Sequence, residues 1–391
     1  MTVREAVIVG AVRTPVGRRG GALSAWHPVD LLGQTLRALV ERTGIDPAQI
    51  DDVITGCVLQ QEQQAGNIGR HAVLAAGFPE SVPAVTVDRQ CGSGQQAVSF
   101  AAQGVLAGSY DHAIACGVES MSQVPMPAAM VPGAPLGPHY SPRELARYGG
   151  ALVAQGPSSE LMNEKFDLSR AALDAFSARS HGRALAATRA GKFREQLVPM
   201  RVNPDDAAST LVESDEGIRE HLDRDKMASL KTVFAADGRT TAANSSQLSD
   251  GAAALLIADR AFAERHGLTP RARFRALSVA GADPVIQFTA VLDATRKALE
   301  FSGLGVDDID LFEVNEAFAG VPMMFAQEFG VPDDKLNVNG GSVAIGHPLG
   351  STGARMLTDL LCELERSGAS VGLQSICEAN GTANTTIIER I

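Results

Sequence analysis

The chain has 391 residues, of which 45% are hydrophobic and 20% are charged. This composition is typical of a folded globular protein and excludes a disordered chain, a collagen-like repeat and a disulfide-stapled miniprotein. The formal net charge of −11 argues against nucleic acid as the main partner. The sequence contains no run of 18 apolar residues, so no membrane span is expected. The length predicts two or three structural units around a sizeable core.

The cysteine pattern points to a reducing compartment. Five cysteines at wide spacings fit neither a secreted disulfide framework nor a zinc-binding pattern. The first residues lack the basic, apolar and small-residue succession of a signal peptide. We therefore expect reduced thiols, no bound metal and a cytoplasmic location.

Two distant segments share one pattern. Residues 31–58 and residues 291–318 each combine an amphipathic helix, a turn with two aspartates and an apolar strand. Asp52 precedes Cys91 by 39 residues, and Asp308 precedes His347 by the same number. The shared pattern predicts an internal duplication in which Cys91 and His347 occupy equivalent elements.

The expected elements alternate between strands and helices. Strands are predicted over residues 6–9, 53–58, 84–87 and 112–117, then 250–259, 273–279, 311–314 and 371–376. Helices are predicted over residues 31–42, 68–76 and 95–107, then 290–301, 320–329 and 352–366. This alternation indicates a layered α/β fold with mostly parallel strands.

The middle of the chain has a different character. Residues 118–246 begin with a stretch rich in Pro, Met and Gly, and they include a charged helical stretch over 169–192. Long insertions of this kind are usually lids or binding elements. We expect three units: an N-terminal half over 1–117 plus 247–268, a loop domain over 118–246, and a C-terminal half over 269–391.

Cys91 is the first candidate for chemistry. In VTVDRQCGSGQQAV, residues 85–98, an apolar strand runs into this cysteine and a helix follows. Backbone N–H groups and the helix dipole at such a position favour a thiolate. One alternative is a buried structural cysteine. Another is a dinucleotide fingerprint, Gly92-x-Gly94-x-x-Ala97, although the cysteine occupies the turn that a pyrophosphate would need.

Three further residues complete a constellation. His347 lies among five glycines, and Cys377 ends an apolar strand. Asn315 also lies between a strand and a helix, where helix capping is the alternative role. Because sites in α/β proteins form at the carboxyl ends of strands, these side chains are expected to meet. A thiolate activated by imidazole attacks acyl groups, and a second thiol can act as acid and base.

These motifs resemble those of the thiolase family, the acetyl-CoA acetyltransferases and 3-ketoacyl-CoA thiolases. The resemblance covers essentially the whole chain. It includes Cys-Gly-Ser-Gly at 91–94, Asn-Glu-Ala-Phe at 315–318, Gly-His-Pro-x-Gly-x-Thr-Gly at 346–353, and the late Cys377. It implies a thiolase-like fold with two duplicated βαβαβαββ halves, α-β-α-β-α layering, an inserted loop domain, and a homodimer or homotetramer.

The resemblance also implies roles for the candidate residues. Cys91 would be the acylated nucleophile, His347 would lower its pKa, and Cys377 would exchange the proton at the α-carbon. Asn315 would hold a water that forms one oxyanion hole with His347. The backbone N–H groups of Cys91 and Ala379 would form the second hole.

Coenzyme A contacts and the overall reaction follow from the same resemblance. Residues 237–246 resemble the segment leading to the coenzyme A pocket, and Arg219 and Ser246 match positions that contact coenzyme A. The implied function is a coenzyme A-dependent C-acyltransferase that condenses or thiolyses 3-ketoacyl-CoA. Acetyl-CoA, 3-ketoacyl-CoA and coenzyme A would be substrates, with no metal or redox cofactor.

Two alternative functions stay open at this point. A ketoacyl-synthase-like condensing enzyme would use two histidines where this chain offers His347 and Cys377. A non-catalytic acyl-CoA or lipid-binding protein would have no use for the full set of reactive residues.

Three segments depart from the family pattern. Glu378-Ala379-Asn380-Gly381 follows Cys377 where relatives usually carry x-Gly-Gly-Gly, Ala154-Gln155-Gly156 replaces His-Met-Gly, and residues 284–289 form a shortened segment. We expect these departures to restrict the choice of acyl group. For Glu378 two placements are open: a carboxylate that disfavours the neighbouring thiolate, or a side chain that points into solvent.

Overall fold

A computed structural model describes residues 4–126 and 140–391. Part of the Pro/Met/Gly-rich stretch, residues 127–139, lies outside the described residues. The main sheet has the strand order β10-β11-β12-β9-β1-β8-β5-β3-β4, with β2 paired to β8. Its strands are β1 (Ala6–Arg13), β2 (Gly17–Arg18), β3 (Val53–Gly56), β4 (Ala84–Val87), β5 (His112–Ser120), β8 (Ser249–Asp259), β9 (Ala272–Gly281), β10 (Leu311–Val314), β11 (Val371–Glu378) and β12 (Thr382–Arg390).

The sheet is mixed, so the expectation of mostly parallel strands is wrong. Among the strand pairs of the described residues, only β3–β4, β3–β5 and β10–β11 are parallel. β12, which the sequence analysis missed, follows β11 after a tight turn at Ala379–Gly381. Strands joined by so short a turn must run antiparallel. β5 and β8 are also antiparallel, and the long insertion connects them in place of a crossover helix.

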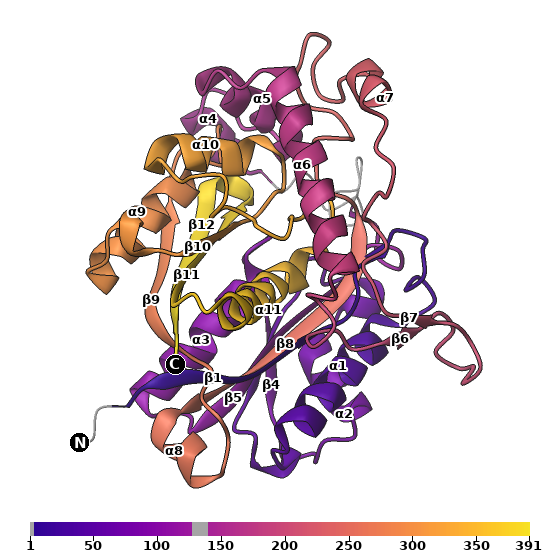
Figure 1. Ribbon diagram of the computed structural model, residues 1–391, viewed down its shortest axis with the longest axis vertical. Helices are drawn as coiled ribbons and strands as arrows, with labels where there is room; N and C mark the ends of the chain where they lie inside the picture. Colours follow the sequence, from indigo (N-terminus) through magenta and orange to yellow (C-terminus); the bar gives the residue numbers. More distant parts are fainter. Residues whose placement is uncertain (1–3, 127–139) are drawn as a thin grey trace.

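The helices and sheet halves form five layers (Figure 1). α1 (Pro28–Thr43) and α2 (Ile68–Ala75) cover one outer face, and α9 (Ala290–Ser302) and α10 (Gly320–Phe329) cover the other. Between the two halves of the sheet lie α3 (Ser93–Ala107) and α11 (Leu349–Ser367), which pack against each other. The α-β-α-β-α layering implied by the resemblance is confirmed.

The two halves repeat the same succession of elements. α1 is followed by a 3₁₀ turn (Pro47–Gln49) and β3, and α9 is followed by a 3₁₀ turn (Val306–Asp308) and β10. α3 and α11 both end at a left-handed glycine, Gly108 and Gly368. The predicted duplication is therefore confirmed at the level of these elements. The halves join through β1 and β9, which share two residue pairs.

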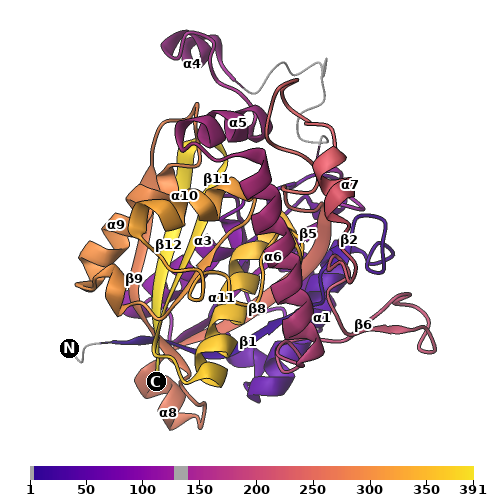
Figure 2. The ribbon, with the colours of Figure 1, turned by 45° about the horizontal axis from the view of Figure 1, so that its top comes forward.

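The insertion between β5 and β8 carries its own elements. These are α4 (Pro142–Arg147), α5 (Gln155–Lys165), α6 (Arg170–Arg189), α7 (Arg224–Ser229), and the short pair β6 (Met200–Arg201) and β7 (Leu211–Val212). α5 packs on α10, and α6 runs past α11 (Figure 2). α8 (Arg260–Arg265) follows β8. The division into two halves and a loop domain stays a prediction, and β5 runs to Ser120, past the boundary expected at 117.

The two central helices meet through glycines. A Cβ atom added to Gly94 of α3 would lie 2.6 Å from the carbonyl oxygen of Gly350 in α11. A Cβ added to Gly353 would lie 2.1 Å from the backbone nitrogen of Gln95. Only glycine allows backbones to approach so closely. The approach brings together the N-terminal ends of both helices, and with them Cys91 and His347, which each lie two residues before their helix.

The glycine contact can be tested through stability. Gly353→Ala should lower the free energy of unfolding by about 1–3 kcal/mol, because the added methyl group meets backbone atoms that cannot move aside. Gly182→Ala in α6 is the matched control, since an added Cβ there meets nothing within 4 Å. The control should be neutral or stabilise the fold by a few tenths of a kcal/mol. Equal unfolding free energies for both variants in urea titrations would contradict the contact.

Candidate active site

Tight turns position both Cys91 and His347. Gln90 has a φ angle of 47° directly before Cys91, and Gly346 has a φ angle of 118° directly before His347. A non-glycine residue at positive φ stores strain and is common where a reactive side chain must be aimed. The left-handed conformation of Gln90 was not predicted, because nothing in the local sequence requires it.

Cys91 is buried, and its burial opposes ionisation of the thiol. Only 4% of the residue is exposed, and it packs with Met121, Leu349, Met356 and Ile376. Burial raises the pKa of the Cys91 thiol to about 12, and the nearby Glu378 carboxyl adds to this shift, while the Gln155 amide opposes it. Burial thus opposes the thiolate that the helix N-terminus favours. A base must remove its proton when substrate is bound.

His347 has the properties of that base. Its Nδ1 lies 2.7 Å from Thr352 Oγ1, and the Thr352 hydroxyl donates to the carbonyl of Pro348 at 2.9 Å. Because that hydroxyl proton is already used, Nδ1 must carry the imidazole proton and donate it to Thr352. Burial lowers the pKa of His347 to about 3, and Arg355 contributes to the shift. Nε2 is then an unprotonated acceptor.

Asn315 is held so that its amide nitrogen stays free. Its Oδ1 accepts a hydrogen bond from the Ser342 hydroxyl at 2.6 Å, and Ser342 Oγ accepts one from Arg355 Nη2 at 3.2 Å. This chain of donors fixes which end of the amide is the oxygen. The N-cap of α10 is Ala319, so the helix-capping alternative for Asn315 is wrong.

Cys377 lies beside these groups near the end of β11. The backbone N–H of Asn315 donates to the carbonyl of Ser375, two residues before Cys377, at 3.0 Å. Cys377 is fully buried, and burial together with the charges of Cys91 and Glu378 raises its pKa well above the ordinary thiol value. Because Glu378 directly follows Cys377 and its carboxyl group lies on Gly92, the residue after Cys91, the two thiols lie in one site.

Asn315 Nδ2, His347 Nε2 and Glu378 Oε1 are among the buried polar atoms without a hydrogen-bond partner in the described part of the chain. Unpaired buried polar atoms cost free energy, and in native proteins they concentrate at sites that bind a ligand or do chemistry. The cluster therefore marks a place where polar substrate atoms bind.

Glu378 does not point into solvent. Its side chain is fully buried, and its Oε2 accepts a hydrogen bond from the Thr382 hydroxyl at 2.6 Å. A Cβ atom added to Gly92 would lie 2.0 Å from Glu378 Oε1, so the carboxyl group rests on the backbone next to Cys91. Burial raises the pKa of Glu378 to about 8. Of the two placements open in the sequence, the structure selects the carboxyl beside the thiols.

The three segments that depart from the family pattern touch one another. Gln287 Nε2 donates to the carbonyl of Val153 at 2.7 Å, and the backbone N–H of Asn380 donates to Gln287 Oε1 at 3.0 Å. The Ser158 hydroxyl donates to the carbonyl of Ile286 at 2.7 Å. The three departing segments and the residues that flank 154–156 form what we call the acyl wall (residues 153–158, 284–289 and 378–381), which includes Gln155 and Glu378 beside Cys91.

The residues predicted to contact coenzyme A, and Ala379 of the predicted oxyanion hole, are at least partly exposed. Ser246 is half-buried, and its backbone N–H donates to the carbonyl of Ala317 at 2.9 Å, within the Asn-Glu-Ala-Phe segment. Arg219 is exposed, and its backbone N–H donates to His181 Nδ1 at 3.2 Å. Ala379 directly follows the buried Glu378 and is half-buried.

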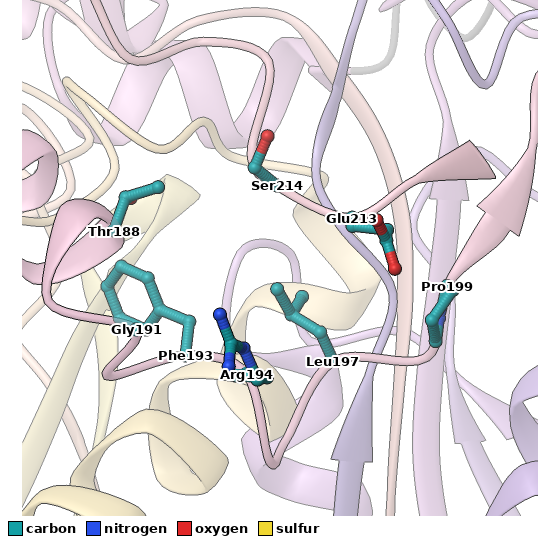
Figure 3. Close-up of a pocket in the computed structure, with 8 residues that line it drawn as sticks. All are labelled: Thr188, Gly191, Phe193, Arg194, Leu197, Pro199, Glu213 and Ser214. Atoms are coloured by element: carbon teal, nitrogen blue, oxygen red, sulfur yellow. The ribbon is translucent and has the colours of Figure 1, made fainter. Parts of the chain in front are cut away.

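Two cavities lie away from the candidate reactive residues. One of about 400 Å³ is lined by the residues in Figure 3: Thr188, Gly191, Phe193, Arg194, Leu197, Pro199, Glu213 and Ser214. A second, of about 540 Å³, is lined by residues around Arg194 and Cys362. Neither includes a candidate reactive residue among the described residues that line it. The reactive groups are instead closely packed, since Cys91, His347, Cys377 and Asn315 are each less than 5% exposed.

Thr352, Ser342 and Gln155 were not predicted as site residues. Thr352 and Ser342 stand in the glycine-rich segment around His347, but nothing in their spacing shows which acceptor each hydroxyl meets. Gln155 was noted only as a departure from His-Met-Gly. Its position beside Cys91 depends on how α5 packs against the core.

The fold and the site together indicate the class of enzyme. A buried thiol, a neutral imidazole with a free acceptor nitrogen and a second thiol form a site for acyl transfer through a cysteine thioester. Comparison with protein families gives the same class. "Thiolase, N-terminal domain" matches residues 6–261, and "Thiolase, C-terminal domain" matches residues 268–390.

Known proteins match the chain over nearly its full length. It is 49% identical to "Steroid 3-ketoacyl-CoA thiolase FadA6" of Mycobacterium tuberculosis, over 99% of this chain and 94% of that protein. It is 38% identical to "3-ketoacyl-CoA thiolase" of Bacillus subtilis, over 99% of this chain and all of that protein. The crystal structure of the Bacillus anthracis acetyl-CoA acetyltransferase superposes with a TM-score of 0.90 at 36% identity, covering 100% of this chain and 99% of that one.

The chain therefore belongs to the thiolase family, and its activity is coenzyme A-dependent acyl transfer. This finding decides against the two alternatives left open in the sequence, a ketoacyl-synthase-like enzyme and a non-catalytic binding protein. No helix in residues 4–126 and 140–391 is long and apolar enough to cross a bilayer.

The tautomer of His347 can be tested through Thr352. Thr352→Val removes the acceptor for Nδ1–H, so the imidazole loses its preference for the tautomer that leaves Nε2 free. We expect kcat to fall by about tenfold or more, a usual loss for a misplaced general base. Thr352→Ser keeps the hydroxyl and should retain most of the rate. Equal kcat values for the valine and serine variants would show that the hydroxyl does not orient His347.

Proposed function

We propose that the protein cleaves 3-ketoacyl-CoA by thiolysis through an acyl group on Cys91. His347 Nε2 takes the Cys91 proton as the sulfur attacks the 3-keto carbon. The bond between C2 and C3 then breaks, the acyl group stays on the Cys91 sulfur, and Cys377 protonates C2 to release acetyl-CoA. Coenzyme A next attacks the Cys91 thioester, with its thiol proton passing to Cys377, and His347 returns a proton to Cys91. The same steps in reverse are the Claisen condensation.

The unpaired atoms of the site support these assignments. Asn315 Nδ2 is a buried donor, suited to hold a water that stabilises the thioester enolate together with His347. The backbone N–H groups of Cys91 and Ala379 are proposed to bind the oxyanion of the tetrahedral intermediate on Cys91. Arg219 and Ser246 are proposed to contact coenzyme A. No step needs a metal ion or redox cofactor, because proton transfers among the two thiols and the imidazole balance the reaction.

We propose that the preferred substrate is a 3-ketoacyl-CoA whose acyl group is bulky or carries a ring. Two observations support this proposal: the 49% identity to a protein named a steroid 3-ketoacyl-CoA thiolase, and the altered acyl wall beside Cys91. The wall places the amide of Gln155 and the carboxyl of Glu378 beside Cys91, and it has Ala379 and Asn380 where relatives usually carry glycine.

We also propose an oligomeric state and a location for the protein. Its membership of the thiolase family supports a homodimer or a homotetramer. The five cysteines of the chain are all unpaired, which supports a reducing location such as the cytoplasm.

The roles of the two reactive cysteines can be separated by intact-protein mass spectrometry after incubation with acetyl-CoA. Cys91→Ala should show no acetylation, because the sulfur that forms the thioester is gone. Cys377→Ala should still become acetylated but should fail to condense or thiolyse, with kcat reduced by about a thousandfold or more. Cys116→Ala, a change at a buried cysteine of β5, is the control and should behave as wild type. Acetylation of Cys91→Ala at the wild-type rate would overturn the assignment.

The substrate proposal can be tested by a thiolysis screen. We expect kcat/KM for ring-bearing or branched 3-ketoacyl-CoA substrates to exceed that for acetoacetyl-CoA. Ala379→Gly combined with Asn380→Gly should reduce this preference, because it restores backbone freedom to a turn in which Asn380 has a φ angle of 63°. A preference for acetoacetyl-CoA in the wild type would contradict the substrate class. An unchanged preference in the double variant would move the source of selectivity to the insertion.

A further inference from the structure

Glu378 occupies a position between the two reactive cysteines. It directly follows Cys377 in β11, and its carboxyl group lies on Gly92, the residue that directly follows Cys91. Its charge acts on both thiols, and for each it opposes the thiolate. No step of the proposed thiolysis uses this carboxyl group, although it is fully buried in the middle of the site.

The hydrogen bonding of Glu378 indicates where its proton resides. Thr382 donates its hydroxyl proton to Oε2 at 2.6 Å, so Oε2 acts as an acceptor. The other oxygen, Oε1, is buried against Gly92 and has no hydrogen-bond partner in the described residues. An ionised Oε1 would be a bare buried charge, whereas a protonated Oε1 is neutral. The geometry therefore favours the neutral acid with its proton on Oε1.

The charged groups that face Glu378 come from two elements. Arg89, in the turn before α3, favours the ionised carboxylate, and Asp88 beside it disfavours that form. Cys91 in the same turn and Cys377 on β11 are the thiols whose ionisation Glu378 opposes. With burial as the largest cause, the pKa of Glu378 rises to about 8, within the range where enzymes of this type can be assayed.

We propose that Glu378 is a positioning residue that tunes both reactive thiols: its neutral form permits their ionisation, and its ionised form suppresses it. This inference rests on the proposed roles of Cys91 and Cys377. At pH values below the pKa of Glu378, the carboxyl group is neutral, and burial is the main effect that opposes ionisation of each thiol. Above that pKa, each thiol must ionise beside a buried negative charge, so its reactivity rises less steeply with pH.

The test is the rate of iodoacetamide alkylation of Cys91 between pH 6.5 and 9.5, read from the Cys91 peptide by mass spectrometry. In the wild type the logarithm of this rate should rise with pH and then flatten near pH 8, where Glu378 ionises. In Glu378→Gln the flattening should disappear, since the amide cannot ionise. At pH 9.5 the variant should react faster than wild type by on the order of tenfold, and at pH 6.5 the two rates should agree.

A second variant tests in which direction the pKa of Glu378 shifts. Thr382→Val removes the hydroxyl that stabilises the ionised carboxylate, so the flattening should move to higher pH instead of vanishing.

Glu313→Gln is the matched control. It removes another buried carboxyl whose pKa burial raises, but one that faces Asp359 and Arg355 rather than the cysteines. Its alkylation profile should match that of the wild type.

The outcomes separate this inference from the proposed function. Identical pH profiles for wild type and Glu378→Gln would overturn the tuning role even if Cys91 still forms an acyl-enzyme. A profile that changes equally in Glu378→Gln and Glu313→Gln would also overturn it, because the effect would then come from losing any buried carboxyl. Alkylation is measured without acyl-CoA, so a failure of the thiolysis proposal leaves this test intact.

Discussion

The close approach of α3 and α11 is the constraint on which the rest of the site depends. Gly94 and Gly353 let the backbones of the two helices touch, so that both N-terminal ends meet between the two halves of the sheet. A side chain at either position would push the helices apart and separate the turns that carry Cys91 and His347. The duplication thus has a chemical consequence, because equivalent turns of the two halves supply different groups, a thiol from one and an imidazole from the other.

Burial at this meeting point determines the protonation states. Desolvation opposes both the Cys91 thiolate and the His347 imidazolium, so burial disfavours an ion pair between them. Buried ionic contacts next to the site orient the side chain of Asn315. Arg355 donates to Asp359 at 2.7 Å and to Ser342 at 3.2 Å, and Arg13 donates to Asp359 at 2.8 Å. This network ties α11 to β1 and, through Ser342, fixes the amide of Asn315.

Local sequence signals were sufficient to predict the bounds of some elements, but other elements could not be predicted from them. β4, β10 and α10 have the predicted bounds, because apolar runs with clear turns mark their ends. β12 escaped prediction since its polar centre, Asn384 to Thr386, is buried between strands and breaks the expected apolar pattern. Cys91 and His347 were recognisable from their glycine-rich neighbours, whereas the placement of Glu378 depends on Gly92, which lies 286 residues away in the chain. Contacts of that kind arise only once the two halves have docked.

The most direct test of the central claim is a crystal structure of the protein after reaction with acetyl-CoA. The account predicts an acetyl group on the Cys91 sulfur, with His347 Nε2 and the Cys377 sulfur both within about 4 Å of the thioester, the reach of direct proton transfer with modest adjustment. It also predicts Glu378 beside Gly92. An acetyl group on another residue, or an imidazole turned away so that Nδ1 faces the thioester, would contradict it.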